Sequence, residues 1–291
     1  MNVMATSNEE KTPKRKRSRK STFPTFYLSL LTILTYVPIA VVVVYSFNES
    51  KISSVWDGFS LRWYKELFQD PAMFRALFIS ILLGVSSCLI AAVIATLAAI
   101  GFPKAKLPGS KLVEYLSSAP IIIPEIVLGM VFLVYFSLLK LPFGMTTLII
   151  AHTSFCIPYI YMEVKARLIG LDESYYEAAR DLGASSIRAF FDITLPLIMP
   201  AVISGMFLSF AMSFDDVIIS VFVTGVNTDT LPIKVYTQLK TSTTPKINAL
   251  CTLMLTVTVF CYVMSYVFSR IGKRNIKTQK EREHEEAIRK A

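Results

Sequence analysis

Six long apolar stretches constrain the fold of this chain more than any other feature of its sequence. A helix needs about 20 predominantly apolar residues to cross the roughly 30 Å of hydrocarbon in a bilayer. Of the 291 residues, 53% are hydrophobic and only 18% are charged, a composition that favours the bilayer over water as the solvent. We therefore expect an all-α, polytopic membrane protein with six transmembrane helices. They are predicted at residues 25–46, 75–101, 117–139, 145–162, 198–224 and 247–270, the fourth being the shortest.

Basic residues gather at both ends of the chain, next to a membrane segment. The net charge of +9 could suggest nucleic acid, but seven Lys and Arg residues precede the first apolar stretch and eight lie at or beyond the end of the last. The positive-inside rule then predicts that both termini are cytoplasmic (N-in, C-in), and it gives no reason to expect nucleic acid as a partner. We expect a basic cytoplasmic tail at 1–24, one membrane domain at 25–270 and a charged cytoplasmic tail at 271–291.

Two prolines interrupt the third apolar stretch. Pro120 and Pro124 predict kinked or locally unwound backbone, because proline lacks the N–H donor that a helix interior requires. Such backbone is tolerated within a membrane only where it is buried in protein or lines a cavity.

The loop at 47–74 is predicted to lie outside the cell, and it is rich in aromatic residues. Their spacing fits a short amphipathic helix at the membrane interface, where Trp and Tyr are enriched. A face for an external partner is the alternative. The residues concerned are Trp56, Phe59, Trp63, Tyr64 and Phe68.

Cysteine and histidine give no sign of catalysis or of metal binding. His152 lies in the fourth apolar stretch and His284 in the charged tail, and neither belongs to a plausible nucleophile–base pair. We therefore predict no catalytic residue, no disulfide and no metal site. The four cysteines lack CxxC spacing and all fall within predicted spans: Cys88, Cys156, Cys251 and Cys261.

The cytoplasmic loop at 163–197 has the pattern of two short helices joined by a glycine. Asp172 or Ser174 can cap the first helix, and Gly183 supplies its stop. The second helix is expected from about Ser185 to Leu195-Pro196, where proline ends it before the fifth span. Such an element could transmit the motion of a partner, or it could simply connect two spans, and the residues alone leave both open.

This loop resembles the EAA loop of binding-protein-dependent ABC importer permeases. Glu177-Ala178-Ala179, Gly183, Ile193 and Leu195-Pro196 fill every position of that pattern at its spacing. The resemblance implies that the loop docks a cytoplasmic ATPase, with Glu177 and Gly183 central. It also implies a type I importer in a bacterial cell membrane, built from two permease chains, two ATPase chains and an external solute-binding protein.

A nucleotide site is missing from the sequence itself. The chain contains no GxxxxGK[ST] loop of the kind that cradles phosphates. We therefore expect ATP and Mg²⁺ to be bound by the partner ATPase, with no cofactor in this chain and no enzyme activity of its own.

Three acidic residues fall inside the predicted spans. Glu125 follows Pro124 in the third span, and Asp215 and Asp216 lie in the fifth. Ionisable groups at membrane depth are costly and normally face a bundle interior or a water-filled pathway. Carboxylates along a pathway suit a cationic solute, and on one helix only one of the adjacent Asp residues would face it squarely. Alternatively, these acids pair with a partner's Lys or Arg, or satisfy the backbone of a broken helix.

The wider chain is similar to the spermidine/putrescine branch of this family, in particular to its second permease subunit. The motifs are Tyr45-Ser-Phe-Asn48, Trp63-Tyr64, Ala119-Pro120 with Pro124-Glu125, Ser213-Phe-Asp-Asp216 and Thr224-Gly225. The resemblance implies a polyamine importer permease, without separating spermidine from putrescine. A permease for another solute, such as ferric iron or an amino-acid derivative, is the alternative within the class. Outside it are an intramembrane acidic enzyme using Glu125 with one of the two Asp residues, and a structural scaffold.

Overall fold

The computed structural model describes residues 22–52, 55–104, 118–172, 174–241 and 245–290. These residues are mostly helical, and the described ranges contain no β-strand, only an isolated bridge between Asn48 and Phe59. The chain divides into two units, residues 1–41 and 42–291. Of the predicted N-terminal tail, the part up to residue 21 lies outside the described residues.

The first unit consists, in its described part, of most of helix α1 (Thr22–Tyr45). The helix is apolar almost throughout, and its segment Phe26–Tyr45 is long enough to cross a membrane. This agrees with the first predicted span.

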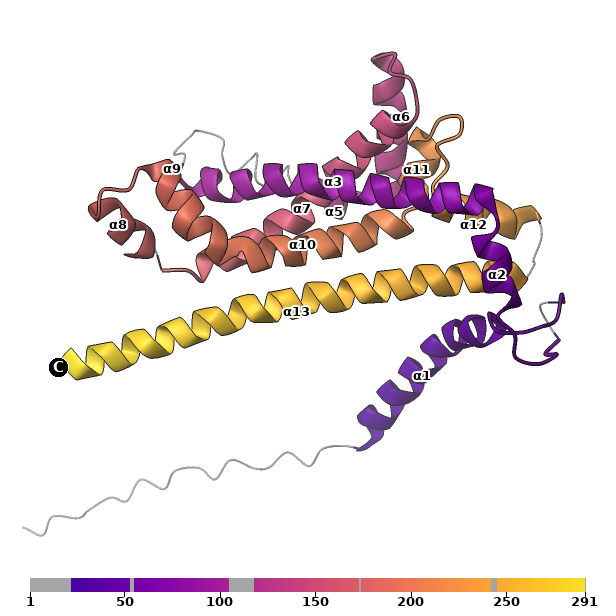
Figure 1. Cartoon of the computed structure of the whole chain (residues 1–291), viewed down its shortest axis with the longest axis horizontal. Helices are drawn as coiled ribbons and strands as arrows, with labels where there is room; N and C mark the ends of the chain where they lie inside the picture. The colour runs from indigo at the N-terminus through magenta and orange to yellow at the C-terminus, as the bar shows by residue number, and fades with distance from the viewer. Residues whose placement is uncertain (1–21, 53–54, 105–117, 173, 242–244, 291) are drawn as a thin grey trace, which may run out of the picture. The chain divides into compact units, whose positions relative to one another are not determined.

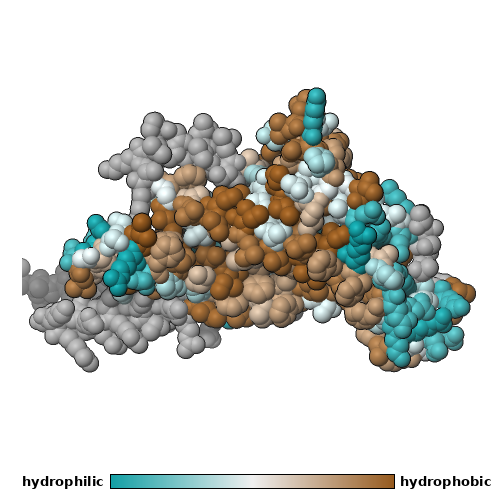
Figure 2. Space-filling view, turned by 45° about the horizontal axis from the view of Figure 1, so that its top comes forward, coloured by the Kyte–Doolittle hydropathy of each residue, from teal (hydrophilic) through white to brown (hydrophobic). Residues whose placement is uncertain are grey.

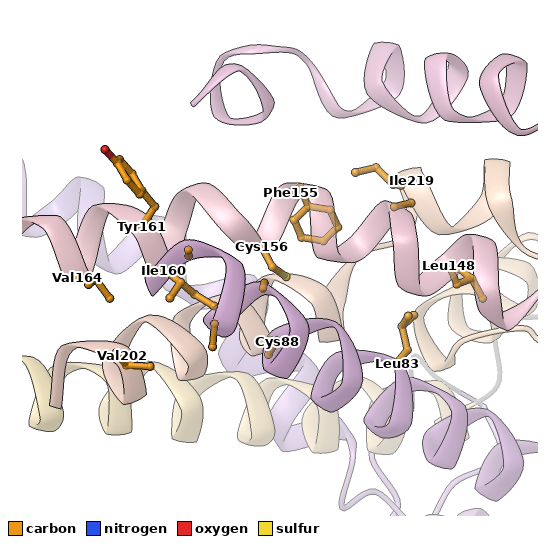
Figure 3. Close-up of a cluster of buried hydrophobic side chains, with 14 of the residues drawn as sticks. Leu83, Cys88, Leu148, Phe155, Cys156, Ile160, Tyr161, Val164, Val202 and Ile219 are labelled. Carbon is orange, nitrogen blue, oxygen red and sulfur yellow. The ribbon is translucent and has the colours of Figure 1, made fainter. Parts of the chain in front are cut away.

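The second unit is built around three long helices: α3 (Pro71–Lys104), α7 (Met145–Ile169) and α10 (Leu195–Asp215). They pack against one another, and α13 (Pro245–Lys290) packs along α10 (Figure 1). The interior between them is a cluster of buried apolar side chains to which all three helices contribute (Figure 3).

Small residues bring these helices close together. Ala91, Ala95 and Ala99 on α3 are almost fully buried in this core. On α10, a Cβ placed at Gly205 would lie only 2.9 Å from the Cα of Ile160 on α7. Small side chains allow such close backbone approach in a membrane, where helix association has no hydrophobic driving force.

The outer surface of the second unit is apolar over much of its area. Figure 2 shows apolar side chains covering the middle of the helices, with hydrophilic side chains gathered toward their ends. Large apolar residues of α3, among them Phe78, Val93 and Leu97, point outward and are exposed. A surface of this kind is compatible with lipid as the surrounding solvent.

Within the described parts of the chain, five helical segments are long and apolar enough to cross a membrane. The third predicted stretch is instead divided into α5 (Ala119–Ile122) and the 14-residue α6 (Glu125–Leu138), so the total of six spans and the N-in, C-in orientation remain predictions. Between α5 and α6 the backbone is extended at Ile123 and Pro124, which confirms the predicted break. The five segments are Phe26–Tyr45, Pro71–Pro103, Met145–Ile169, Ser186–Asp215 and Pro245–Gly272.

The fifth predicted span is also divided, at the two aspartates for which satisfying a broken helix was one of the alternatives. Helix α10 ends at Asp215, the backbone is extended at Asp216, and α11 (Ile218–Val223) begins two residues later. The prediction of one continuous helix at 198–224 is therefore wrong. The physical reason is that the Asp216 side chain accepts backbone N–H groups of the next helix, which favours a helix start over a helix interior.

The loop predicted to be external forms one short helix, α2 (Arg62–Phe68), as the aromatic spacing predicted. Trp63, however, is buried, and its Nε1–H donates to the carbonyl of Asn48 over 2.7 Å. Its assignment to the membrane interface is therefore wrong, because the indole finds its hydrogen-bond partner within the protein. Phe59 and Phe68 remain exposed, as an interface or a partner would require.

Candidate functional site

The segment after α7, predicted to be cytoplasmic, begins with α8 (Ser174–Asp181). The Asp172 carboxylate accepts the backbone N–H of Ser174 at 2.9 Å, so that the start of α8 is capped as the sequence suggested. Glu177 lies in the first turn, where a negative charge is favourable, and its side chain is exposed. Ala178 is also exposed, whereas Ala179 is partly buried.

Gly183 ends this helix with a left-handed backbone conformation, φ +89°. The N–H of Gly183 bonds to the carbonyl of Arg180 at 2.9 Å, and the N–H of Ala184 bonds to that of Ala179 at 3.0 Å. These two bonds form a Schellman motif, which requires a residue that tolerates positive φ. A Cβ at Gly183 would meet nothing within 4 Å, so the demand for glycine is conformational and not steric.

The second short helix does not end at the Leu195-Pro196 pair. Ser185 caps α9 (Ser186–Ala189), which continues through a π-helical turn, η1 (Phe190–Thr194), directly into α10. The prediction that Pro196 ends a helix is therefore wrong. Proline lies in the first turn of α10, where its missing N–H is tolerated, and the π turn accommodates it by bonding Leu195 N–H to the Phe190 carbonyl.

Three large apolar side chains of this segment are exposed, and the sequence interpretation did not single them out. Leu182 is 90% exposed, Ile187 71% and Phe191 58%. The available signal was the presence of large apolar residues in a loop between two predicted spans. Glu177, Gly183 and Pro196 are exposed on the same segment, while Ile193 and Leu195 are partly buried.

A cavity of about 590 Å³ lies beside α8, between this segment and the ends of α3 and α7. Glu177 and Ile193 both contribute to its wall. The helix runs without interruption from α9 through η1 into α10, and the cavity lies beside it. A partner's surface could lie against this part of the molecule.

The three predicted intramembrane acids meet at a second cavity, of about 350 Å³. Glu125 reaches it from the first residue of α6, and Asp215 and Asp216 from the junction of α10 and α11. Phe155 and Tyr159 of α7 supply aromatic surface to the same cavity. Two helix breaks therefore bring together residues that are about 90 positions apart in the chain.

The two adjacent aspartates differ sharply in their surroundings. Asp216 is 8% exposed, and its carboxylate accepts Ile219 N–H at 3.2 Å and Ser220 N–H at 2.8 Å. Its Oδ2 also accepts the Ser220 hydroxyl at 2.7 Å. Asp215 and Glu125 are exposed at the cavity, and neither is ion-paired within the described parts of the chain. Asp216 thus accepts the N–H groups at the start of α11, while the carboxylates of Asp215 and Glu125 face the cavity.

His152 lies behind this junction and is completely buried. Its Nδ1 is 2.7 Å from the Ser213 hydroxyl on α10, and its Nε2 is 3.0 Å from the Ser220 hydroxyl on α11. Each ring nitrogen of the imidazole thus has a hydroxyl within hydrogen-bond distance. Its partners lie 61 and 68 positions away, so the sequence offered no means of identifying them.

A protein-family model matches most of this chain. Residues 91–277 match the model described as "Binding-protein-dependent transport system inner membrane component". Among curated proteins, the chain is 38% identical over 250 residues to the "Putrescine transport system permease protein PotI" of Escherichia coli K12, covering 83% of this chain and 89% of that protein. It is 35% identical over 244 residues to the "Spermidine/putrescine transport system permease protein PotC" of the same strain, covering 84% and 92%.

Solved structures agree on the fold. A chain of a bacterial ABC transporter involved in the import of the acidic polysaccharide alginate aligns with a TM-score of 0.63 at 14% identity, over 86% of this chain and 97% of that one. A chain of an amino acid ABC transporter aligns with a TM-score of 0.51 at 15% identity, over 76% and 100%. At these identities the likeness concerns the fold, which is that of ABC importer permeases.

Proposed function

The chain belongs to the binding-protein-dependent transport system inner membrane component family, and we propose that it forms half of the pathway of an ATP-driven importer for polyamines. It is a multi-pass protein of the bacterial plasma membrane and a transport subunit of the ABC permease class. Two relatives that match over most of their length carry putrescine or spermidine/putrescine in their names, which supports a polyamine as the solute.

The observation that carries the proposal is the cavity shared by Glu125, Asp215 and Asp216. Carboxylates in an apolar surround attract an ammonium group strongly, because little water screens them. The faces of Phe155 and Tyr159 add a surface that suits both a cation and the methylene chain between two ammonium groups. A polyamine presents this combination of separated positive charges and apolar linker.

The α8–η1 segment would receive the energy for transport. We expect Glu177, Gly183 and the exposed apolar side chains of Leu182, Ile187 and Phe191 to contact a separate cytoplasmic ATPase, present in two copies. The unbroken helical path from Ser186 to Asp215 would carry motion of the ATPase from the docking surface to the acidic cavity. ATP and Mg²⁺ would remain on that partner, while a sister permease and an external solute-binding protein complete the importer.

Uptake of radiolabelled putrescine and spermidine by cells carrying the complete importer tests the proposal. Asp215→Asn and Glu125→Gln should each lower uptake on the order of tenfold, since each removes a charge that faces the cavity. Glu66→Gln is the matched control, because Glu66 pairs with Arg62 on the external helix α2, away from the cavity. Normal polyamine uptake by both cavity variants, or energised uptake of ferric iron or an amino-acid derivative in place of polyamine, would overturn it.

A further inference from the structure

The buried histidine behind the acidic cavity is bonded to both sides of the helix break. Its Nδ1 contacts Ser213, which precedes the break on α10, and its Nε2 contacts Ser220, which follows it on α11. His152 itself belongs to α7. One side chain thus ties three helical segments together at the point where the cavity's carboxylates project.

The hydrogen bonds around His152 have a defined direction. The Ser220 hydroxyl donates its hydrogen to Asp216 Oδ2 at 2.7 Å, so it can only accept from His152 Nε2–H. With that hydrogen on Nε2, the neutral imidazole accepts the Ser213 hydroxyl at Nδ1. Every hydrogen in the chain from Ser213 through His152 and Ser220 to Asp216 then has an acceptor.

A second contact links the same imidazole to the cavity wall. The rings of His152 and Phe155 lie one helical turn apart on α7, with centroids 5.0 Å apart, and Phe155 lines the acidic cavity. His152 therefore touches a residue of the aromatic wall and, through Ser220, the carboxylate that caps α11.

We propose that His152 is a positioning residue for the transport pathway. Through Ser213, Ser220 and Asp216 it holds the α10–α11 break in the one arrangement that turns Asp216 inward and leaves Asp215 facing the cavity. The inference rests on the proposed function only for the identity of the solute. Its central claim is that the geometry of the break depends on a hydrogen-bonded histidine, and not merely on a side chain of that volume.

The test compares two substitutions of similar size in the complete importer. His152→Phe keeps a ring and removes both polar contacts, whereas His152→Gln retains a donor that can reach Ser220. In His152→Phe we expect the amount of polyamine taken up per ATP hydrolysed to fall about tenfold. The carboxylates at the break lose the hydrogen-bonded histidine that positions them, while the α8–η1 segment is unchanged. His152→Gln should recover a large part of this ratio. A role in folding alone would instead lower uptake and ATP hydrolysis in proportion.

Thr153→Val provides the matched control on the same helix. Its hydroxyl is buried next to His152 but has no hydrogen-bond partner within the described residues, so its removal should leave the ratio unchanged. Combining His152→Phe with Asp215→Asn should cost little more than Asp215→Asn alone, since the histidine acts through that carboxylate. Independent, additive losses would contradict the proposal.

A chemical readout separates failure of this inference from failure of the proposed function. Ile218 lines the cavity directly after the break, so an Ile218→Cys chain should react with a cationic thiol reagent above the background of the native cysteines. Adding His152→Phe should change that rate severalfold whatever the solute is, and His152→Gln should restore it. An unchanged rate would overturn the inference even if polyamine uptake is confirmed. If the rate of thiol modification changes but no polyamine is taken up, only the assignment of polyamine as the solute is rejected.

Discussion

The carboxylate of Asp216 and the hydroxyl of Ser220 lie 2.7 Å apart across the two-residue break between α10 and α11. The same carboxylate accepts the backbone N–H groups of Ile219 and Ser220. A negative charge at 8% exposure is therefore held by three donors, all of them from the helix that it caps. Such an arrangement stabilises the break and leaves the adjacent Asp215 to the cavity.

Removal of the Ser220 hydroxyl should destabilise the folded protein. Ser220→Ala leaves Asp216 without its side-chain donor and His152 Nε2–H without its acceptor, and a buried polar group left unpaired costs about 1–3 kcal/mol. Thermal unfolding of the purified protein in detergent measures the effect. Thr252→Val, whose hydroxyl only bonds back to the Asn248 carbonyl in its own helix, should change the midpoint much less. Equal midpoints for the two variants would contradict the assignment.

A methyl group at Gly205 should separate α7 from α10. The added Cβ would lie 2.9 Å from the Cα of Ile160, a backbone atom that cannot rotate away, so Gly205→Ala should cost about 1–3 kcal/mol through forced repacking. Gly101→Ala on α3 is the control, because a Cβ there meets nothing within 4 Å. Gly101→Ala should be neutral or slightly stabilising in the same unfolding assay, as alanine favours the helix over glycine.

The Asp70–Lys246 ion pair should give stability a specific acid dependence. Its Nζ and Oδ2 atoms are 2.5 Å apart, and this contact, together with the N–H groups of Met73 and Ala72, lowers the pKa of Asp70 below its usual value despite partial burial. A lowered carboxyl pKa means that the folded state binds fewer protons, so the stabilisation is present above about pH 4 and is lost as pH falls further. The difference in unfolding midpoint between wild type and Asp70→Asn should stay constant from pH 7 to 5 and shrink below pH 4. A difference that grows on acidification would have the wrong sign.

Hydropathy and proline positions predicted the helical class and the break at Pro124, because each depends on local chemistry. The break at Asp216 was left open by the sequence, which allowed either a continuous span or a carboxylate that satisfies a broken helix. The capping bonds to Ile219 and Ser220 decide between them. The sequence also could not show whether Trp63 lies at the membrane interface or in the protein interior, because an apolar side chain suits both. Its bond to the Asn48 carbonyl decided that, and such a contact exists only in the folded chain.

The α8–η1 segment was predicted more completely than the cavity. The spacing from Glu177 to Pro196 indicated a capped helix and a glycine turn, because these features depend on neighbouring residues. Proline at 196 can either end a helix or be accommodated by a π turn that continues it. No residue pattern in the loop indicated the π turn that the structure forms at Phe190–Thr194. The grouping of Glu125 with Asp215 in one cavity depends on how α6 packs against α11, which is a tertiary relationship.

A charge at one of the three exposed apolar positions of the α8–η1 segment should weaken contact with the ATPase without unfolding the permease. Leu182 is 90% exposed, so Leu182→Asp removes little packing, but it places a carboxylate where an apolar partner surface is expected. Recovery of the ATPase with the purified permease should fall about tenfold or more. Val226→Asp is the matched control, since Val226 is equally exposed, at 90%, in the turn after α11. Equal ATPase recovery in both variants would reject Leu182 as a docking residue.

Substitution at Gly183 should uncouple the ATPase from transport in proportion to how poorly the new residue tolerates positive φ. With φ at +89° and open space around the position, volume is not the obstacle. Asparagine visits left-handed backbone readily, whereas a β-branched residue strains it by about 1–3 kcal/mol. Gly183→Asn should therefore retain most polyamine uptake, while Gly183→Val should lose it on the order of tenfold by reorienting α8 relative to η1. Uptake and ATP hydrolysis are measured together, with insertion checked by the yield of folded protein. If Val and Asn at this position support the same uptake per ATP, the Schellman turn has no part in coupling.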